Sequence, residues 1–176
     1  MPRRDGTLVV DGEHATLTFR RLYPHAIDHV WDAIATEQGR AGWLMCTHEV
    51  FEGKVGGRCD MVSGPARYRS TGRILVWEPP HVLEYEWNVA PVPEMPEGQR
   101  AIFRFELARE GDATRLIVTY RRITLATARG FLPGAHALLD RLEAQLDDRE
   151  LPDFNARFAE LRLTYDWDGH APAADQ

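Results

Sequence analysis

Histidines at three positions could do chemistry near neutral pH. His25 and His29 lie four residues apart in a segment with helical periodicity, which is the spacing of paired metal ligands on a helix. No His-Glu-x-x-His pattern or third ligand accompanies them, so we expect a solvated helix face and no metal site. His136 lies next to an apolar stripe, where an imidazole could orient a ligand or carry a proton. A packed structural histidine is the alternative interpretation of His136.

Charged residues on two predicted strands could also serve a site. Glu84 and Glu86 share one strand face, opposite that of Tyr85, so we expect surface carboxylates and not a hydrolytic pair. Arg122 has the inward parity of Tyr120. On a regular strand its guanidinium would point toward the mouth of a cavity, where it could bind a carboxylate or phosphate. A bulge or the end of the strand would instead release Arg122 to solvent.

Large aromatic side chains are the strongest functional lead. They could line an apolar pocket in which a hydroxyl orients a bound molecule. They could equally fill the core, as buried aromatics commonly do. The candidates are Trp43, Trp77, Tyr85, Trp87, Phe103, Phe105 and Tyr120. Tyr68 and Trp77 have opposite strand parity, so both face inward only if a bulge separates them.

Strands must position most of these residues. Residues 83–87, 101–107 and 116–120 alternate apolar and polar side chains. This period of two predicts a sheet with one covered and one solvated face. The Pro-rich segment 90–98 cannot join a sheet ladder, and the glycines of segment 53–57 predict a turn. We expect these two segments to form the rim of a cavity.

Helices must cover the apolar face of that sheet. Apolar residues at helical spacing predict a helix from about 25 to 35, and a shorter helix is expected over 37–43. A stripe from Ala135 to Leu146 predicts a long covering helix after Pro133. A further helix is expected to end near residue 166.

Composition bounds the class of protein. The chain has 176 residues and a net charge of −6 with scattered basic residues, which disfavours a nucleic-acid partner. Membrane insertion is not expected, because no apolar run is long enough. No Gly-x-Gly-x-x-Gly or Walker pattern indicates a nucleotide cofactor, and we expect no cofactor. Cys46 and Cys59 are interpreted as reduced thiols of a cytoplasmic protein without a signal peptide. We expect one domain over residues 1–168 and a disordered tail over 169–176.

The order of these elements resembles the START-like (SRPBCC) superfamily, in the branch named after activators of the heat-shock protein 90 ATPase. The segments that carry the resemblance are residues 21–34, 51–58, 71–80, 83–87, 114–120 and 134–140. In that branch, the start of the last helix more often has a tryptophan where Ala135 stands. The resemblance implies an α+β helix-grip fold of the START/Bet v type. In this fold a curved antiparallel sheet of about seven strands surrounds a long C-terminal helix, and two short helices follow the first long strand.

The resemblance also implies a cavity between the sheet and the last helix, but no shared reaction, since relatives bind lipids, aromatic polyketides, hormones or proteins. We therefore predict a protein that binds a small apolar or amphipathic molecule. One alternative is an enzyme of the cyclase or dehydratase type with His136 as proton carrier. Another is a chaperone-associated interaction module, and a homodimer through an exposed sheet edge is a further hypothesis.

Overall fold

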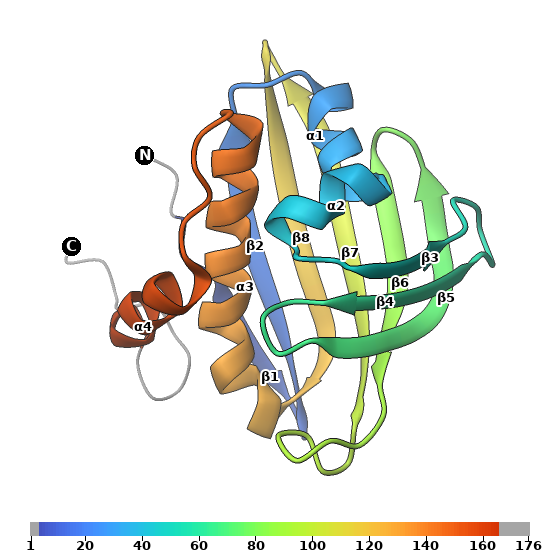
Figure 1. Cartoon of the computed structure of the whole chain (residues 1–176), viewed down its shortest axis with the longest axis vertical. Coiled ribbons are helices and arrows are strands. Elements are labelled where there is room, and N and C mark those ends of the chain that lie inside the picture. The colour runs from blue at the N-terminus through green and yellow to red at the C-terminus, as the bar shows by residue number, and fades with distance from the viewer. Residues whose placement is uncertain (1–3, 166–176) are drawn as a thin grey trace.

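The alternating runs of the sequence form the strands of one curved antiparallel sheet (Figure 1). The computed structural model describes residues 4–165, and in this part of the chain the sheet has eight strands in the order β1-β2-β8-β7-β6-β5-β4-β3. The strands are β1 (Thr7–Asp11), β2 (His14–Tyr23), β3 (His48–Phe51), β4 (Arg58–Ser63), β5 (Tyr68–Glu78), β6 (Val82–Val89), β7 (Gln99–Glu110) and β8 (Ala113–Thr124).

The number of strands exceeds the expected seven by one. At one edge of the sheet, β1 pairs with β2 alone, from Thr7 opposite Thr18 to Asp11 opposite His14. Gly12 adopts a positive φ of 61° between these strands, which a glycine tolerates without strain. The tight turn therefore lets the N-terminal segment fold back and add a strand to the sheet.

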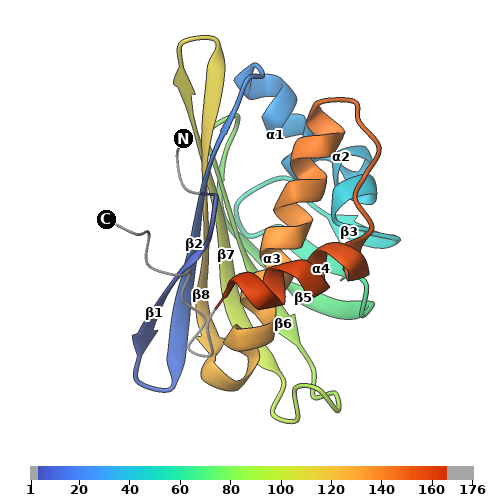
Figure 2. The same ribbon diagram turned by 90° about the vertical axis from the view of Figure 1, so that its left-hand side faces the viewer.

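The helices of residues 4–165 are α1 (Ile27–Ala35), α2 (Glu37–Trp43), α3 (Leu125–Leu146) and α4 (Phe154–Thr164). Figure 2 shows these helices on one side of the sheet, with the other face free of them. Side-chain caps fix two of the helix starts. The Thr36 hydroxyl accepts from the Gly39 amide at 3.0 Å, and the Asp153 carboxylate accepts from the Ala156 amide at 2.8 Å.

The long helix α3 begins ten residues before the predicted stripe (125 against 135) and includes Pro133. A proline inside a helix costs roughly 3 kcal/mol because it lacks a donor and crowds the preceding turn. Ala128 and Leu132 are nonetheless buried in this first part of the helix, at 1% and 0% exposure. Packing against the sheet therefore stabilises α3 on both sides of Pro133. Judged from the sequence alone, this proline favours the start of a helix and not its interior.

The core lies between the concave face of the sheet and α3. On β7, Phe103 and Phe105 are buried, whereas the intervening Arg104 is partly exposed on the other face. This arrangement confirms the predicted one-sided sheet. No helix among residues 4–165 is long and apolar enough to cross a membrane. The predicted tail over 169–176 lies outside the described residues.

Candidate ligand-binding cavity

A cavity of about 400 Å³ lies between the N-terminal half of α3, helix α4 and the turn that joins β4 to β5. Trp87, Phe103 and Ala135 are buried residues of its wall. Pro65 and Glu94 also line it and are exposed, so they mark its rim. The remaining lining residues are Leu44, Ser63, Gly64, Ala66, Tyr68, Met95, Ala126, Thr127, Gly130, Phe131, Gly134, Leu138, Phe154 and Phe158.

A second, smaller cavity of about 40 Å³ lies deeper, between α3 and the aromatic face of the sheet. Its lining residues are Trp43, Leu44, Met61, Ser63, Tyr85, Trp87, Phe103, Phe105, Tyr120, Phe131, Ala135 and Leu138. This space is about a tenth as large as the outer cavity. Side chains therefore fill most of the space between α3 and the sheet at the inner cavity, whereas the outer cavity is open.

Phe131 lies in the wall between the two cavities and lines both. Its ring centroid lies 5.2 Å from that of Tyr120, 5.7 Å from that of Phe103 and 5.8 Å from that of Trp87. These are distances of favourable edge-on aromatic packing. Because Phe131 comes from the part of α3 before Pro133, the unexpected early start of the helix is what divides the space.

Six of the seven aromatic candidates meet at these cavities. Trp43, Tyr85, Trp87, Phe103, Phe105 and Tyr120 line the inner one, and Trp87 and Phe103 also line the outer one. Tyr85 and Tyr120 each contribute a phenol to the residues that line the inner cavity. Burial raises the pKa of both phenols, so each is a neutral donor at physiological pH.

Trp77 lines neither of these cavities, although it does face the helix side of the sheet. A register shift between Ile74 and Val76 in the pairing of β5 with β6 reverses the strand parity. Tyr68 therefore reaches the outer cavity, while Trp77 packs 5.4 Å from Trp31, between ring centroids. Gly53 packs closely under Trp77, so the glycine turn predicted as a rim element stands away from both cavities.

Arg122 does not point toward the cavity, and the expectation of an inward guanidinium is corrected. The pairing of β8 with β2 shifts register between Tyr120 and Ile123, and Arg122 adopts a positive φ of 63° and is exposed. The Gln99 side chain secures this bulge by donating to the Arg122 carbonyl at 2.9 Å. Ile123 takes the inward position at 0% exposure.

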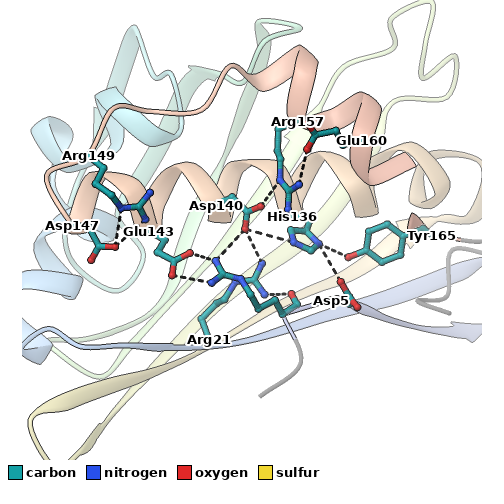
Figure 3. Close-up of polar contacts among 11 residues, drawn as sticks. Asp5, Arg21, His136, Asp140, Glu143, Asp147, Arg149, Arg157, Glu160 and Tyr165 are labelled. Atoms are coloured by element: carbon teal, nitrogen blue, oxygen red, sulfur yellow. Dashed lines mark hydrogen bonds and ion pairs between the residues drawn. The ribbon is translucent and has the colours of Figure 1, made fainter. Parts of the chain in front are cut away.

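His136 is buried but lines neither cavity; it belongs to a polar network on another side of α3 (Figure 3). Its Nδ1 lies 2.6 Å from the Tyr165 hydroxyl, which accepts from the Gly6 amide at 2.9 Å. Because the Tyr165 oxygen already accepts, its proton is best donated to Nδ1. The imidazole proton then lies on Nε2, 3.6 Å from Asp140.

The same network holds three segments together electrostatically. The Asp140 carboxylate pairs with Arg157 Nε of α4 at 2.7 Å and lies 3.5 Å from the buried Arg21 of β2. The Arg21 guanidinium also donates to the Arg4 carbonyl. Burial lowers the pKa of His136 to about 4, so this histidine is neutral near pH 7. Its environment is that of a structural contact between the N-terminal segment, α3 and α4.

His25 and His29 also fall outside the cavities. His25 lies 2.7 Å from Asp147, between Nε2 and Oδ1, and its ring is 5.4 Å from that of His29. Among residues 4–165 no group of three or more His, Cys, Asp or Glu side chains could hold a metal ion.

Several cavity residues have no counterpart in the sequence prediction. Phe154 and Phe158 of α4 are four apart, which is a visible helical stripe, but their target could not be inferred without knowing where α4 docks. Phe131 lies before the predicted start of α3. The Pro-rich segment 90–98 does contribute to the rim, through Glu94 and Met95.

The family described as "Activator of Hsp90 ATPase homolog 1-like protein" has a sequence model that matches residues 24–147, more than two thirds of the chain. The chain belongs to this family. The resemblance read from the sequence is therefore confirmed, together with the START-like helix-grip fold. No curated protein matches the chain.

Solved structures similar to this chain come from several bacteria. Protein MLL2253 from Mesorhizobium loti is 25% identical with a TM-score of 0.64, covering 77% of this chain and 99% of its own. The product of gene BPP1335 from Bordetella parapertussis is 26% identical with a TM-score of 0.65, covering 88% and 85%. CalU16 from Micromonospora echinospora, at 20% identity and a TM-score of 0.67 over 90% and 91%, shares the fold.

Proposed function

We propose that this protein binds a small, largely apolar molecule in the 400 Å³ cavity. The observation that carries the proposal is the character of the lining. Aromatic and aliphatic side chains form most of it, with a few polar groups such as Tyr68 and Thr127 at separate points. Small-molecule sites combine an apolar cavity of roughly 300–1,000 Å³ with a small number of polar groups that fix orientation.

Ala135 supports the proposal because it lines both cavities with only a methyl group, where the resemblance described above implies a tryptophan in many relatives. An indole there would project into the space that is now open. The small residue therefore accounts for part of the cavity volume in this chain.

Binding is proposed in preference to catalysis because of the position of His136. The enzyme hypothesis used this histidine as proton carrier, but its Nδ1 accepts from Tyr165 outside the cavity lining. The ionisable side chains that do line the larger cavity are Tyr68 and Glu94. The chaperone-partner and homodimer hypotheses stay predictions.

Native mass spectrometry of freshly purified protein, followed by titration with the neutral fluorescent probe N-phenyl-1-naphthylamine, tests the proposal. We expect a retained small molecule or saturable probe binding with one site per chain. Ala135→Trp should abolish that binding while the melting temperature changes little, because the indole occupies existing space.

Two further variants keep this test interpretable. Gly130→Leu fills the cavity mouth from a position where an added Cβ meets nothing within 4 Å, and it should weaken binding even if Ala135→Trp folds poorly. Ala156→Trp adds an indole on the exposed side of α4 and should bind like the wild type. Equal binding by all four proteins would show that the cavity is not the site.

A further inference from the structure

We propose that the molecule bound in the cavity is an organic cation with an apolar body, an inference that rests on the proposed function and narrows it. The charges of the lining point to this class. Glu94 contributes a carboxylate, and no Lys, Arg or His is among the residues that line the cavity within the described part of the chain. A bound cation would be neutralised at the rim, whereas a bound carboxylate would be repelled there.

Aromatic faces supply a second attraction for positive charge. Trp87, Phe103 and Phe131 form a contiguous wall, with Trp87 and Phe103 stacked at a centroid distance of 5.0 Å. Phe154 and Phe158 of α4 add a stacked pair to the lining, at 5.7 Å. Ring faces attract organic cations, most strongly where water is excluded.

The position of Glu94 is set by the loop that carries it. Val92 and Met95 exchange backbone hydrogen bonds at 3.1 and 2.9 Å across a short turn, and the Gly98 amide donates to the Met95 carbonyl at 2.8 Å. Met95 is 5% exposed and lines the cavity, so it anchors the turn. Glu94, directly before this anchor, is therefore held at the mouth next to Tyr68, whose pKa is raised by burial and further by the charge of Glu94.

The arginines nearest in sequence to the lining residues are directed elsewhere. Arg67 of the β4–β5 turn donates to the Met45 carbonyl at 2.6 Å and also to the Thr47 hydroxyl. Arg129 and Arg162 line a neighbouring groove that shares Gly130 and Phe158 with the cavity, and the Arg162 guanidinium lies 5.9 Å from the centroid of the Phe158 ring. Among the residues that line the cavity itself, Glu94 is the one with a full charge at neutral pH.

Displacement of N-phenyl-1-naphthylamine by three ligands with the same chain tests this inference. Decyltrimethylammonium, decanol and decanoate differ in charge and share the apolar body, and all are used below their micelle concentrations. We expect the cation to displace the probe at about fivefold lower concentration than decanol, and decanoate to be weaker than decanol, because an exposed carboxylate contributes a modest attraction.

Glu94→Gln should bring the cation and the alcohol to within about twofold of each other, since it removes the charge with little change in shape. Glu97→Gln is the matched control, because Glu97 is an exposed residue of the same loop that does not line the cavity. It should keep the wild-type preference.

The outcomes separate this inference from the proposed function. Displacement by decanol and decanoate as strong as by the cation would overturn the cation preference and leave small-molecule binding standing. An unchanged preference in Glu94→Gln would overturn the role of that carboxylate. If the wild type neither retained a small molecule in native mass spectrometry nor bound the probe, the proposed function itself would be overturned.

Discussion

Individual side chains determine how much of the space between α3 and the sheet is open. Phe131 closes the inner end by packing against Tyr120, while Ala135 leaves the outer end wide. Tyr68 is a polar residue among those that line the outer cavity, where its phenol hydroxyl can form a hydrogen bond with a bound molecule.

Tyr68→Phe should therefore weaken ligand binding without loss of stability. Removing one hydrogen bond to a ligand costs about 0.5–1.5 kcal/mol, which corresponds to an affinity about three- to tenfold lower. The melting temperature should be nearly unchanged, because the hydroxyl makes no contact that folding needs. Probe or ligand titration and thermal unfolding of the same preparation measure both quantities.

Tyr165→Phe is the matched comparison, since it deletes the same atom from a hydroxyl that bonds Gly6 and His136. That variant should lose stability and keep affinity. If Tyr68→Phe instead lost stability and affinity to the same extent, Tyr68 would have a structural role and not a binding role.

At the scale of elements, α3 is the piece to which both ends of the described chain attach. The Gly6 amide, the Tyr165 hydroxyl and the His136 ring form a chain of hydrogen bonds from the N-terminal segment through the end of α4 to α3. Figure 3 shows the contact between Tyr165 and His136. Asp140, one turn along α3, pairs with Arg157 of α4. The docking of α4, and with it one wall of the cavity, depends on this network.

Acid should weaken this network through His136. Burial lowers its folded pKa to about 4 from the ordinary value of 6.5. Between these two values the unfolded chain binds more protons than the folded one, so stability is full above pH 6.5 and falls as the pH decreases toward 4. The loss amounts to at most about 1.4 kcal/mol per pH unit. Urea unfolding measured at a series of pH values checks it.

His136→Asn retains an acceptor near the Nδ1 position and removes the titration, so its stability should vary less with pH over this window. His14→Asn, at an exposed position of β2, is the control and should keep the wild-type dependence. Parallel curves for wild type and His136→Asn would show that another group controls the acid response.

At the scale of the whole molecule, the sequence predicts the frame better than the site. The alternation around Phe103 and Phe105 leaves little choice of face, and the helices near Ile27 and Leu142 follow from their spacing. For Arg122 the sequence left an inward side chain and a bulge as alternatives and could not decide between them, because a register shift depends on the partner strand as much as on the strand itself.

The cavity wall depends on contacts between residues distant in sequence. The partner of His136 is Tyr165, 29 residues later, and no local pattern connects them. Phe154 and Phe158 form a stripe that could have covered any apolar surface. The early start of α3 could not be predicted, because Gly130 and Pro133 have low helix propensities. In the structure the burial of Leu132 outweighs these propensities.

Deleting residues 148–176 should leave a folded sheet with α3 and abolish binding in the cavity. The truncation removes Phe154 and Phe158 from the wall and Leu161, which is 2% exposed, from the core. We expect a loss of at least about 2 kcal/mol in the free energy of unfolding. Circular dichroism, urea unfolding and probe titration measure the outcome.

A chain lacking only residues 166–176 is the control and retains α4 in full. It should bind the probe like the wild type. Undiminished binding by the longer deletion would mean that α4 takes no part in the site.

Helix α4 spans residues 154–164 and lies beyond residues 24–147, which the family model matches. A few polar side chains attach this helix to the rest of the fold, and two of its aromatic rings line the cavity. Changes in this short helix can therefore alter the shape of the cavity without altering the sheet. Substitutions within its 11 residues are therefore the most direct way to change which ligand the cavity accepts.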